Sequence, residues 1–266
     1  MNELNILFED EHLIAVNKPS GLLVHPSWIA PRGTPNLASM LKKYFEGGSP
    51  YTIHRLDRPT SGVILFGKNK EIAQKMNVVF AERKVDKTYL CMVRGYTPEQ
   101  DVIDYPLKEQ LDKIADKHAD QDKPAQDAVS HYKRLATVEI DMPVSRYEKS
   151  RYSLVEVKPQ TGRKHQIRRH MKHIFHPIAG DTKHGDNKHN KALRERYELQ
   201  RLMLMASHIS FEHPITGETL SVTAPVDAYT DQLFTNFGWQ GLFPASFKDE
   251  LIEGCRTVFL QPKLES

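Results

Sequence analysis

A single acidic side chain between two arginines is the part of this sequence best suited to chemistry. Asp57 lies in the stretch HRLDRPTSG (residues 54–62), between Arg55 and Arg58. Opposite charges within about 4–6 Å lower the pKa of a carboxyl group and keep it ionised. A catalytic carboxylate that works beside a polyanion needs such an arrangement. An ordinary salt bridge in a surface loop would contain the same residues, so the stretch alone leaves both interpretations open.

A second chemical signal is a run of positive charge that contains no acidic residue. It extends from Val157 to Gly180, and its basic residues are Lys158, Arg163, Lys164, Arg168, Arg169 and Lys172. A stretch of this kind attracts a phosphate backbone, and neutralising phosphates releases counterions. The solvated face of a helix would carry the same pattern. Residues 101–127 carry eight acidic residues against four lysines and indicate a solvated helix or loop.

Four histidines in the basic run raise the question of a metal site. They are His165, His170, His173 and His176. Only successive histidines three positions apart would share a helix face, no HExxH motif is present, and no cysteine lies nearby. Pro177 also ends any helix there. We therefore expect no metal, and the absence of GxGxxG and GxxxxGK[ST] motifs gives no sign of a dinucleotide or P-loop site.

The elements that must position these residues form an α+β pattern. Apolar runs and turn residues predict strands within residues 6–26, 62–68, 87–95 and 151–159, and a hairpin over 202–225. Apolar residues at helical spacing predict amphipathic helices over 34–48 and 69–84, and the basic run predicts a helix over 163–175. Val63 to Phe66 would be a buried strand that fixes the loop of Asp57.

Length and composition limit the class of protein further. The chain has 266 residues, 39% of them apolar and 27% charged, with a net charge of +3, which is typical of a globular protein. The acidic N-terminus predicts no signal peptide, and the apolar runs are too short to cross a membrane. Two cysteines without a CxxC motif indicate a reducing, cytoplasmic location. We expect one domain over residues 1–266, with a C-terminal extension after about residue 239.

The motifs resemble those of a known enzyme family. HRLDRPTSG resembles the HRLDxxTSG signature of the RluA-type pseudouridine synthases, and the blocks NKPSGLLVH, KTYLCMVRG and TGRKHQIRRHM with HPIAGD occur in the family's order. The resemblance extends from about Leu4 to Trp239. It implies a single α+β catalytic domain, with a mixed, largely antiparallel sheet flanked by helices and a central RNA-binding cleft.

The resemblance also implies a reaction and roles for individual residues. The C1′–N1 bond of uridine is broken and the base is rejoined through C5, so neither a metal nor another cofactor is required. Asp57 matches the catalytic aspartate, and Arg168 matches the arginine that pairs with it. Arg55 matches the arginine that enters the space left by the flipped base, and Tyr89 the tyrosine that packs on uracil. The expected RNA-binding residues are Arg163, Lys164, Arg169 and Lys172.

Finer matches concern the substrate. The stretches LVHPSW, LDKIADKHADQDKPAQDAVSHYK and FGWQGLFP resemble the branch of the family that isomerises uridine 65 of tRNA. We therefore expect tRNA as the partner, with no membrane and no obligate protein partner. A ribosomal-RNA pseudouridine synthase and an RNA-binding or folding module with incidental catalysis remain alternatives. A glycosidase is a weaker one, because that chemistry usually needs two carboxylates.

Overall fold

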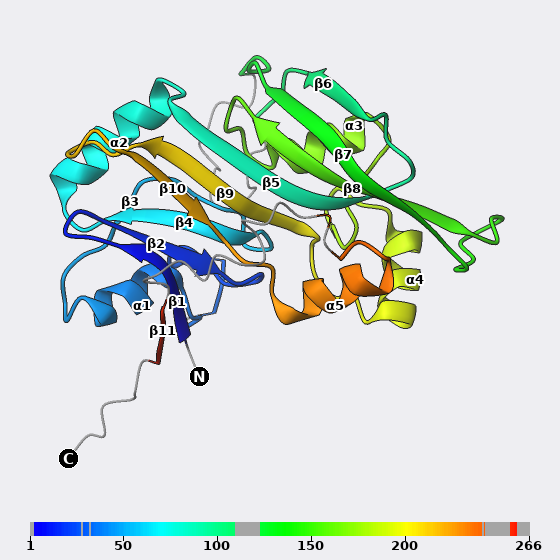
Figure 1. Cartoon of the computed structure of the whole chain (residues 1–266), viewed down its shortest axis with the longest axis horizontal. Helices are drawn as coiled ribbons and strands as arrows, with labels where there is room; N and C mark the ends of the chain where they lie inside the picture. Colours follow the sequence, from blue (N-terminus) through cyan, green and yellow to red (C-terminus); the bar gives the residue numbers. More distant parts are fainter. Residues whose placement is uncertain are drawn as a thin grey trace. The chain divides into compact units, whose positions relative to one another are not determined.

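Strands and helices follow one another in the α+β manner predicted (Figure 1). The computed structural model describes residues 3–27, 29–31, 33–109, 123–240, 242 and 256–259. The strands are β1 (Glu3–Glu9), β2 (Leu13–Lys18), β3 (Tyr51–Thr52), β4 (Ser61–Gly67), β5 (Val85–Arg94), β6 (Gln100–Asp104), β7 (Val129–Ile140), β8 (Ser150–Pro159), β9 (Leu204–Glu212), β10 (Thr219–Thr223) and β11 (Arg256–Phe259). The helices are α1 (Leu37–Tyr44), α2 (Lys70–Ala81), α3 (Gln166–His173), α4 (Asn187–Tyr197) and α5 (Ala228–Asn236).

The chain divides into two compact units. The first takes its described residues from Met1–Asp86, Ala206–Pro225 and Ala245–Ser266, and the second from Lys87–Met205 and Val226–Pro244. Both units are therefore discontinuous in sequence, and the two segments of the second alternate with the three segments of the first. The expectation of one domain over the whole chain stays a prediction.

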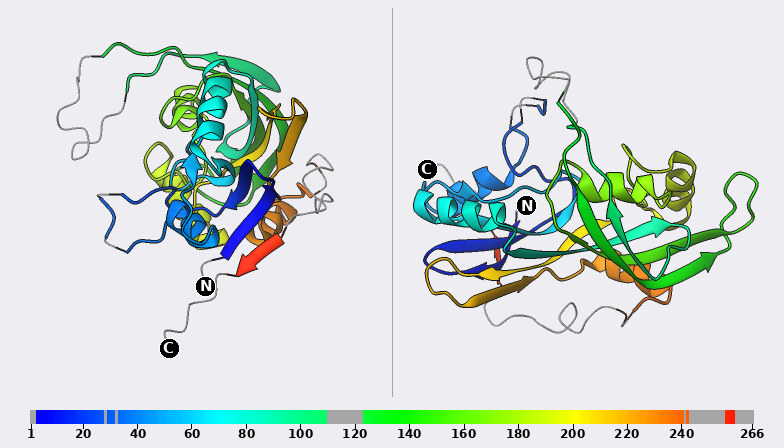
Figure 2. Two further views of the ribbon diagram at one scale, coloured as in Figure 1. Left: turned by 90° about the vertical axis from the view of Figure 1, so that its left-hand side faces the viewer. Right: turned by 90° about the horizontal axis from the view of Figure 1, so that it is seen from above.

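The first unit is built on a sheet with the strand order β11-β1-β2-β4-β9. Strand β10 pairs with β9, and β3 pairs with β4. In the antiparallel pair β2–β4, Lys18 lies opposite Gly62, so the end of β2 meets the start of β4. The predicted run from Val63 to Phe66 is fully buried, and Figure 2 shows α1 and α2 on one face of these strands.

The two helices of the first unit both begin at an asparagine N-cap. The side chain of Asn36 accepts the N–H of Ser39 (3.0 Å), and that of Asn69 accepts the N–H of Ile72 (2.9 Å). Each bond satisfies one of the backbone donors that a helix leaves free at its N-terminus. The predicted hairpin is also confirmed, because β9 and β10 pair with Glu212 opposite Thr219.

The second unit contains strands in the order β5-β8-β7-β6, with antiparallel neighbours. Tyr89 lies opposite Val157, and Val157 lies opposite Tyr132 on the next strand. Trp239 is buried in this unit, where its Nε1–H donates to the carbonyl of Thr137 (3.2 Å). Most of the predicted C-terminal extension lies outside the described residues, and its strand β11 pairs with β1.

The basic helix is shorter at its N-terminal end than predicted. Helix α3 begins at Gln166, so Arg163 and Lys164 lie in the turn before it. His165 has the left-handed conformation (φ 55°, ψ 28°), which interrupts a right-handed helix. The side chain of Gln166 folds back to accept the N–H of Arg163 (3.0 Å) and the hydroxyl of Thr161 (2.7 Å). This local bonding fixes the turn in place of a further helical turn.

The acidic stretch is only partly described. Its first residues form strand β6, whose exposed positions include Asp101 and Asp104, and not a helix or loop. Residues 110–122 lie outside the described residues.

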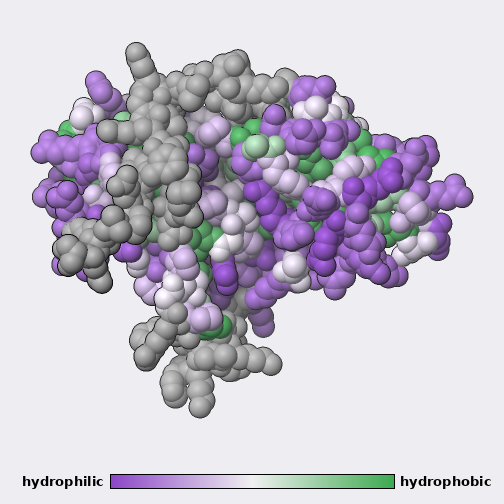
Figure 3. Space-filling view, turned by 90° about the horizontal axis from the view of Figure 1, so that it is seen from below, coloured by the Kyte–Doolittle hydropathy of each residue, from purple (hydrophilic) through white to green (hydrophobic). Residues whose placement is uncertain are grey.

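Figure 3 shows hydrophilic residues over much of one face of the molecule. Within the described part of the chain, no helix is long and apolar enough to span a bilayer.

Candidate active site

The loop that carries Asp57 is tied to the loop between β2 and α1. The N–H of Thr60 donates to the carbonyl of Asp57 (3.0 Å) and closes a turn. Arg58 and Gly21 bond in both directions: the N–H of Gly21 donates to Arg58 O, and Arg58 Nε donates to Gly21 O, each at 2.9 Å. Ser20 Oγ adds a bond to Pro59 O (2.7 Å). These bonds give Arg58 a structural role that the sequence did not indicate.

A buried lysine lies at the centre of this junction. Lys18 is 0% exposed, and its Nζ donates to the carbonyls of Pro19 (3.1 Å), Leu22 (3.0 Å) and Arg58 (3.0 Å). An ammonium group has three N–H donors, so these bonds use all of them. Burial lowers the pKa of Lys18 to about 8, although the negative charge of Asp57 opposes this shift. The amine and the Asp57 carboxylate are therefore close enough to interact electrostatically.

Two further residues of the motif fix the loop against β4 and β9. His54 Nε2 accepts the N–H of Leu65 (3.0 Å), and the imidazole stacks on Phe80 at 5.0 Å between ring centroids. Gly62 has φ +106°, and a Cβ there would lie 2.1 Å from the carbonyl oxygen of Ala206. Only glycine fits both the backbone angle and this approach. Asp57 itself is half-buried and Arg55 is exposed.

In the second unit, Arg168 forms a bidentate ion pair with a buried aspartate. Its Nε and Nη2 donate to the two carboxylate oxygens of Asp181 at 2.7 and 2.9 Å, and the side chains are 5% and 1% exposed. Burial opposes ionisation of Asp181. However, hydrogen bonds from Arg168 and the His184 backbone outweigh burial and lower its pKa. The predicted pairing of Arg168 with Asp57 stays a prediction.

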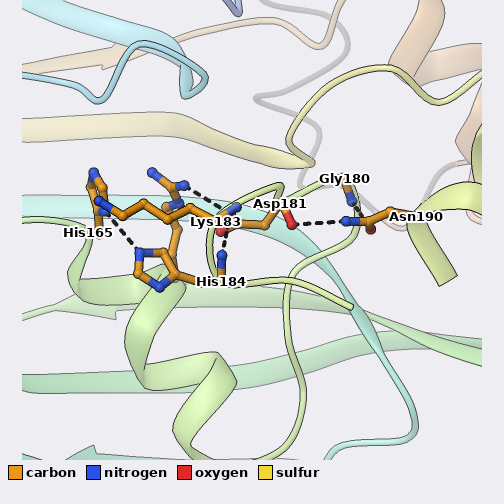
Figure 4. Close-up of polar contacts among 7 residues, drawn as sticks. His165, Gly180, Asp181, Lys183, His184 and Asn190 are labelled. Atoms are coloured by element: carbon orange, nitrogen blue, oxygen red, sulfur yellow. Dashed lines mark hydrogen bonds and ion pairs between the residues drawn. The ribbon is translucent and has the colours of Figure 1, made fainter. Parts of the chain in front are cut away.

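The loop that carries Asp181 is closed by further hydrogen bonds (Figure 4). Asp181 Oδ1 accepts the backbone N–H groups of Lys183 and His184, both at 2.9 Å. Asn190 of α4 donates to Asp181 O (2.9 Å) and accepts the N–H of Gly180 (2.8 Å). These four hydrogen bonds hold the loop, which presents Asp181 to α3 in one orientation.

A histidine pair adjoins this ion pair. His165 Nδ1 and His184 Nε2 are 2.9 Å apart, with the rings edge to face (Figure 4). Burial lowers the pKa of His184 to about 4; the Asp181 charge opposes this, while Arg168 and His165 add to it. His184 is therefore neutral near pH 7. The left-handed backbone of His165 places its ring in this pair.

Tyr89 and helix α3 share one face of the second unit's sheet. Tyr89, Val157 and Tyr132 lie opposite one another along three strands, so their side chains point to the same face. Ser130, two residues from Tyr132, points there as well, and its hydroxyl bonds His170 Nδ1 of α3 (3.0 Å). The helix of Arg168 therefore packs on the face to which the half-buried Tyr89 points.

The predicted RNA-binding residues fall into two groups. Arg163 Nε donates to Asp127 O (3.1 Å), and Arg169 Nη1 donates to Lys108 O (2.9 Å), so both arginines hold backbone on either side of residues 110–122. Lys164 and Lys172 are exposed. The arginines thus have a structural role beside the predicted one.

The four histidines of the basic run all have protein partners. Besides the His165 pair, His170 Nε2 bonds Tyr105 O (3.1 Å), His173 stacks on the ring of Tyr105, and His176 Nδ1 bonds Arg94 O (2.8 Å). Among the residues that the structure describes, no three His, Cys, Asp or Glu side chains gather as a metal site.

The family described as RNA pseudouridylate synthase matches residues 12–173, more than half of the chain. The chain belongs to this family. It is therefore a pseudouridine synthase, an isomerase that acts on RNA, and the resemblance of its motifs is confirmed.

Curated relatives cover nearly the whole chain. The tRNA pseudouridine synthase C of Vibrio parahaemolyticus is 50% identical over 237 residues, which is 89% of this chain and 96% of that protein. The protein of the same name from Haemophilus influenzae is 49% identical over 239 residues (90% and 100%), and that from Yersinia pestis is 48% identical over 241 residues (91% and 93%).

Solved structures show the same fold. Human RNA Pseudouridylate Synthase Domain Containing 4 has a TM-score of 0.66 at 24% identity, covering 88% of this chain and 93% of that chain. Human RNA Pseudouridylate Synthase Domain Containing 1 has a TM-score of 0.62 at 23% identity, covering 88% and 94%. The α+β fold of a pseudouridine synthase, with a largely antiparallel sheet and flanking helices, is confirmed.

Proposed function

We propose that this pseudouridine synthase isomerises uridine 65 of tRNA in the cytoplasm, with Asp57 as its catalytic carboxylate and without a cofactor or an obligate protein partner. The observation that carries the substrate assignment is the identity of about half of all residues, over about nine-tenths of the chain, with proteins named tRNA pseudouridine synthase C. The RNA-binding cleft and the position of the target uridine belong to the proposal.

The geometry of the Asp57 loop supports the catalytic assignment. Hydrogen bonds from Arg58 and from the buried amine of Lys18 hold the Asp57 loop in place. Asp57 itself is half-buried, and Arg55 is exposed. A rigid support keeps a reacting group within a small distance of its working geometry, which lowers the entropic part of the barrier. Arg55 is thereby free to enter the stack from which the uridine leaves.

In the second unit, Tyr89 supplies a ring for the flipped uracil, and Arg168 supplies positive charge for Asp57. The support is that α3 and Tyr89 share one face of the sheet, and that Asp181 fixes the Arg168 guanidinium. A stacking contact contributes about 1–3 kcal/mol per base. The basic turn and helix from Arg163 to Lys172 would contact the phosphate backbone.

The test uses a tRNA transcript labelled with tritium at C5 of its uridines. Formation of the new C1′–C5 bond displaces that hydrogen, so tritium release measures the reaction, and mapping locates the pseudouridine. We expect release from the tRNA alone, at position 65, with or without chelator. Pseudouridine formed only in deproteinised ribosomal RNA would contradict the tRNA assignment.

Asp57→Asn tests the catalytic residue. The change removes a charge and almost no volume, so single-turnover isomerisation should fall at least about 1000-fold while tRNA affinity stays within a few fold. Asp141→Asn, at an exposed position, is the matched control and should keep wild-type activity. Substantial turnover by the Asp57 variant would refute its assignment.

A further inference from the structure

An exposed phenylalanine occupies a backbone position that favours glycine. Phe175 follows helix α3, has φ +64° and is 80% exposed. Its N–H donates to Lys172 O (3.0 Å), and the N–H of His176 donates to Met171 O (2.9 Å). These two bonds define a Schellman motif, in which the left-handed residue after the C-cap is usually glycine because it has no Cβ.

The side chain and the backbone are both unfavourable for the isolated fold. A bulky residue in the left-handed region is a conformational outlier. The described residues include six non-glycine positions at positive φ, of which Phe175 is the apolar one; the others are Glu46, Arg83, Ser145, His165 and Glu198. A lone exposed apolar side chain is ordinary, but strain at the same residue points to a role outside folding.

The turn is held rigidly. Arg94 Nη2 donates to Phe175 O (3.3 Å), and Arg94 Nη1 forms a short hydrogen-bonded ion pair with Asp186, the N-cap of α4. His176 Nδ1 also bonds Arg94 O (2.8 Å). Arg94 thus ties the end of α3 to the start of α4, and the phenyl ring extends from a fixed support. Rigid rings lose little conformational entropy on binding.

Basic residues lie close to Phe175 along the chain. Lys172 is exposed in the last turn of α3, and Lys188 is exposed in the first turn of α4, which Arg94 joins to the Phe175 turn. No acidic residue occurs between Val157 and Gly180. An exposed aromatic ring beside cations that attract phosphates is the combination that binds unstacked or terminal nucleobases.

We propose that Phe175 stacks on an unpaired or helix-terminal base of the tRNA, as a second nucleobase contact besides the flipped uridine. This inference rests on the proposed tRNA substrate. The cations supply salt-dependent attraction, whereas the ring supplies a contact that depends little on salt. Phe175 is a substrate-binding residue and takes no part in the bond exchange.

Three substitutions at this position separate stacking from structure. Phe175→Ala should weaken tRNA binding by roughly 5- to 100-fold, and Phe175→Trp should restore it, because any large π-face serves. Phe175→Gly should bind as weakly as the alanine variant, yet melt at or above the wild-type temperature because glycine relieves the backbone strain. Its folded state therefore remains measurable.

Controls distinguish the ring from its charged neighbours. The salt dependence of binding should be unchanged in Phe175→Ala, whereas Lys172→Ala should reduce the slope of log affinity against log salt by about 1. Tyr147→Ala removes another exposed ring (59%), in the connection between β7 and β8, and should bind tRNA as the wild type does. Tryptophan fluorescence of Phe175→Trp should be quenched by tRNA beyond the wild-type change.

The outcomes are decisive. Wild-type affinity in Phe175→Ala, with the wild type itself binding tRNA, would overturn this inference and leave the proposed function intact. Failure of Phe175→Trp to restore binding would also overturn it. If loss of the ring instead dissociates a dimer in sedimentation while tRNA affinity is unchanged, the ring contacts a second copy. A wild type that neither binds nor modifies tRNA would refute the proposed function as well.

Discussion

Replacing Lys18 with methionine tests whether the buried amine holds the catalytic loop. The substitution keeps a long, unbranched side chain but removes three donors, to the carbonyls of Pro19, Leu22 and Arg58. Two of these oxygens keep a second donor: Arg58 O accepts the N–H of Gly21 (2.9 Å), and Pro19 O that of Leu22 (3.4 Å). The substitution therefore removes the donor to Leu22 O and one of the bonds to the Asp57 loop, at Arg58 O.

The magnitude follows from opposing contributions. Hydrogen bonds from a charged group contribute about 1.5–3 kcal/mol each. Three of them therefore contribute about 5–9 kcal/mol. Burial of the Lys18 ammonium lowers its pKa from 10.5 to about 8, which corresponds to a free-energy cost of about 3 kcal/mol for burying the charge. Methionine removes that penalty together with the bonds. After further relaxation of the loops, we expect the free energy of unfolding to fall by about 2–4 kcal/mol.

The assay measures stability and chemistry on the same preparation. Urea unfolding should show a lower midpoint in Lys18→Met, and single-turnover isomerisation should fall by about 100-fold, since displacement of a reacting group by about 1 Å has that effect. Lys70→Met, at an exposed position in the first turn of α2, should match the wild type in both. A Lys18 variant with an unfolding free energy within about 0.5 kcal/mol of wild type and full activity would refute the role of the amine.

Three further predictions concern other parts of the two units. Gly62→Ala should cost about 3–5 kcal/mol from strain and the clash with Ala206 O, which circular dichroism melting would detect as loss of the folded protein. Arg168→Ala should lower the free energy of unfolding by about 3–5 kcal/mol, because it leaves the buried Asp181 carboxylate unpaired, and should abolish isomerisation. Arg169→Ala should mainly weaken tRNA binding. A fully active Arg168 variant would contradict the role of Arg168. Histidine in the unfolded chain binds a proton near pH 6.5, but His184 in the folded protein does so only near pH 4. The free energy of unfolding should therefore fall by about 3 kcal/mol as the pH drops from 6.5 to 4. Urea unfolding of a His184→Gln variant should show a smaller fall.

The sequence predicted those parts of the fold that depend on local signals. Apolar residues at helical spacing located helices α1 and α2, which begin after Asn36 and Asn69. Alternating and continuous apolar runs likewise located β4, β5 and β8. Such signals act within a few residues, so a single sequence contains them in full.

Contacts between distant segments could not be predicted in this way. A lysine at the end of a strand is usually solvated, and one of the three carbonyls that satisfy the buried Lys18, that of Arg58, lies in the Asp57 loop, far along the chain. The start of α3 was predicted too early, because nothing in the charge pattern shows that His165 is left-handed. Asp181 lay in a recognised block, HPIAGD, but only the fold shows which cation it meets.

The discontinuity of the first unit has a consequence for how the protein is made. The strand β4 lies beside β9, and Gly62 packs against the backbone of Ala206, but the ribosome delivers Ala206 only after the whole segment Lys87–Met205. Pairing over such a separation is slow, because a long loop must close first. The segment Lys87–Met205 of the second unit, which contains α3, is therefore synthesised while the support of Asp57 is still unfinished, and the rest of that unit, Val226–Pro244, follows β9. A nascent chain acquires its basic helix before its catalytic loop is set.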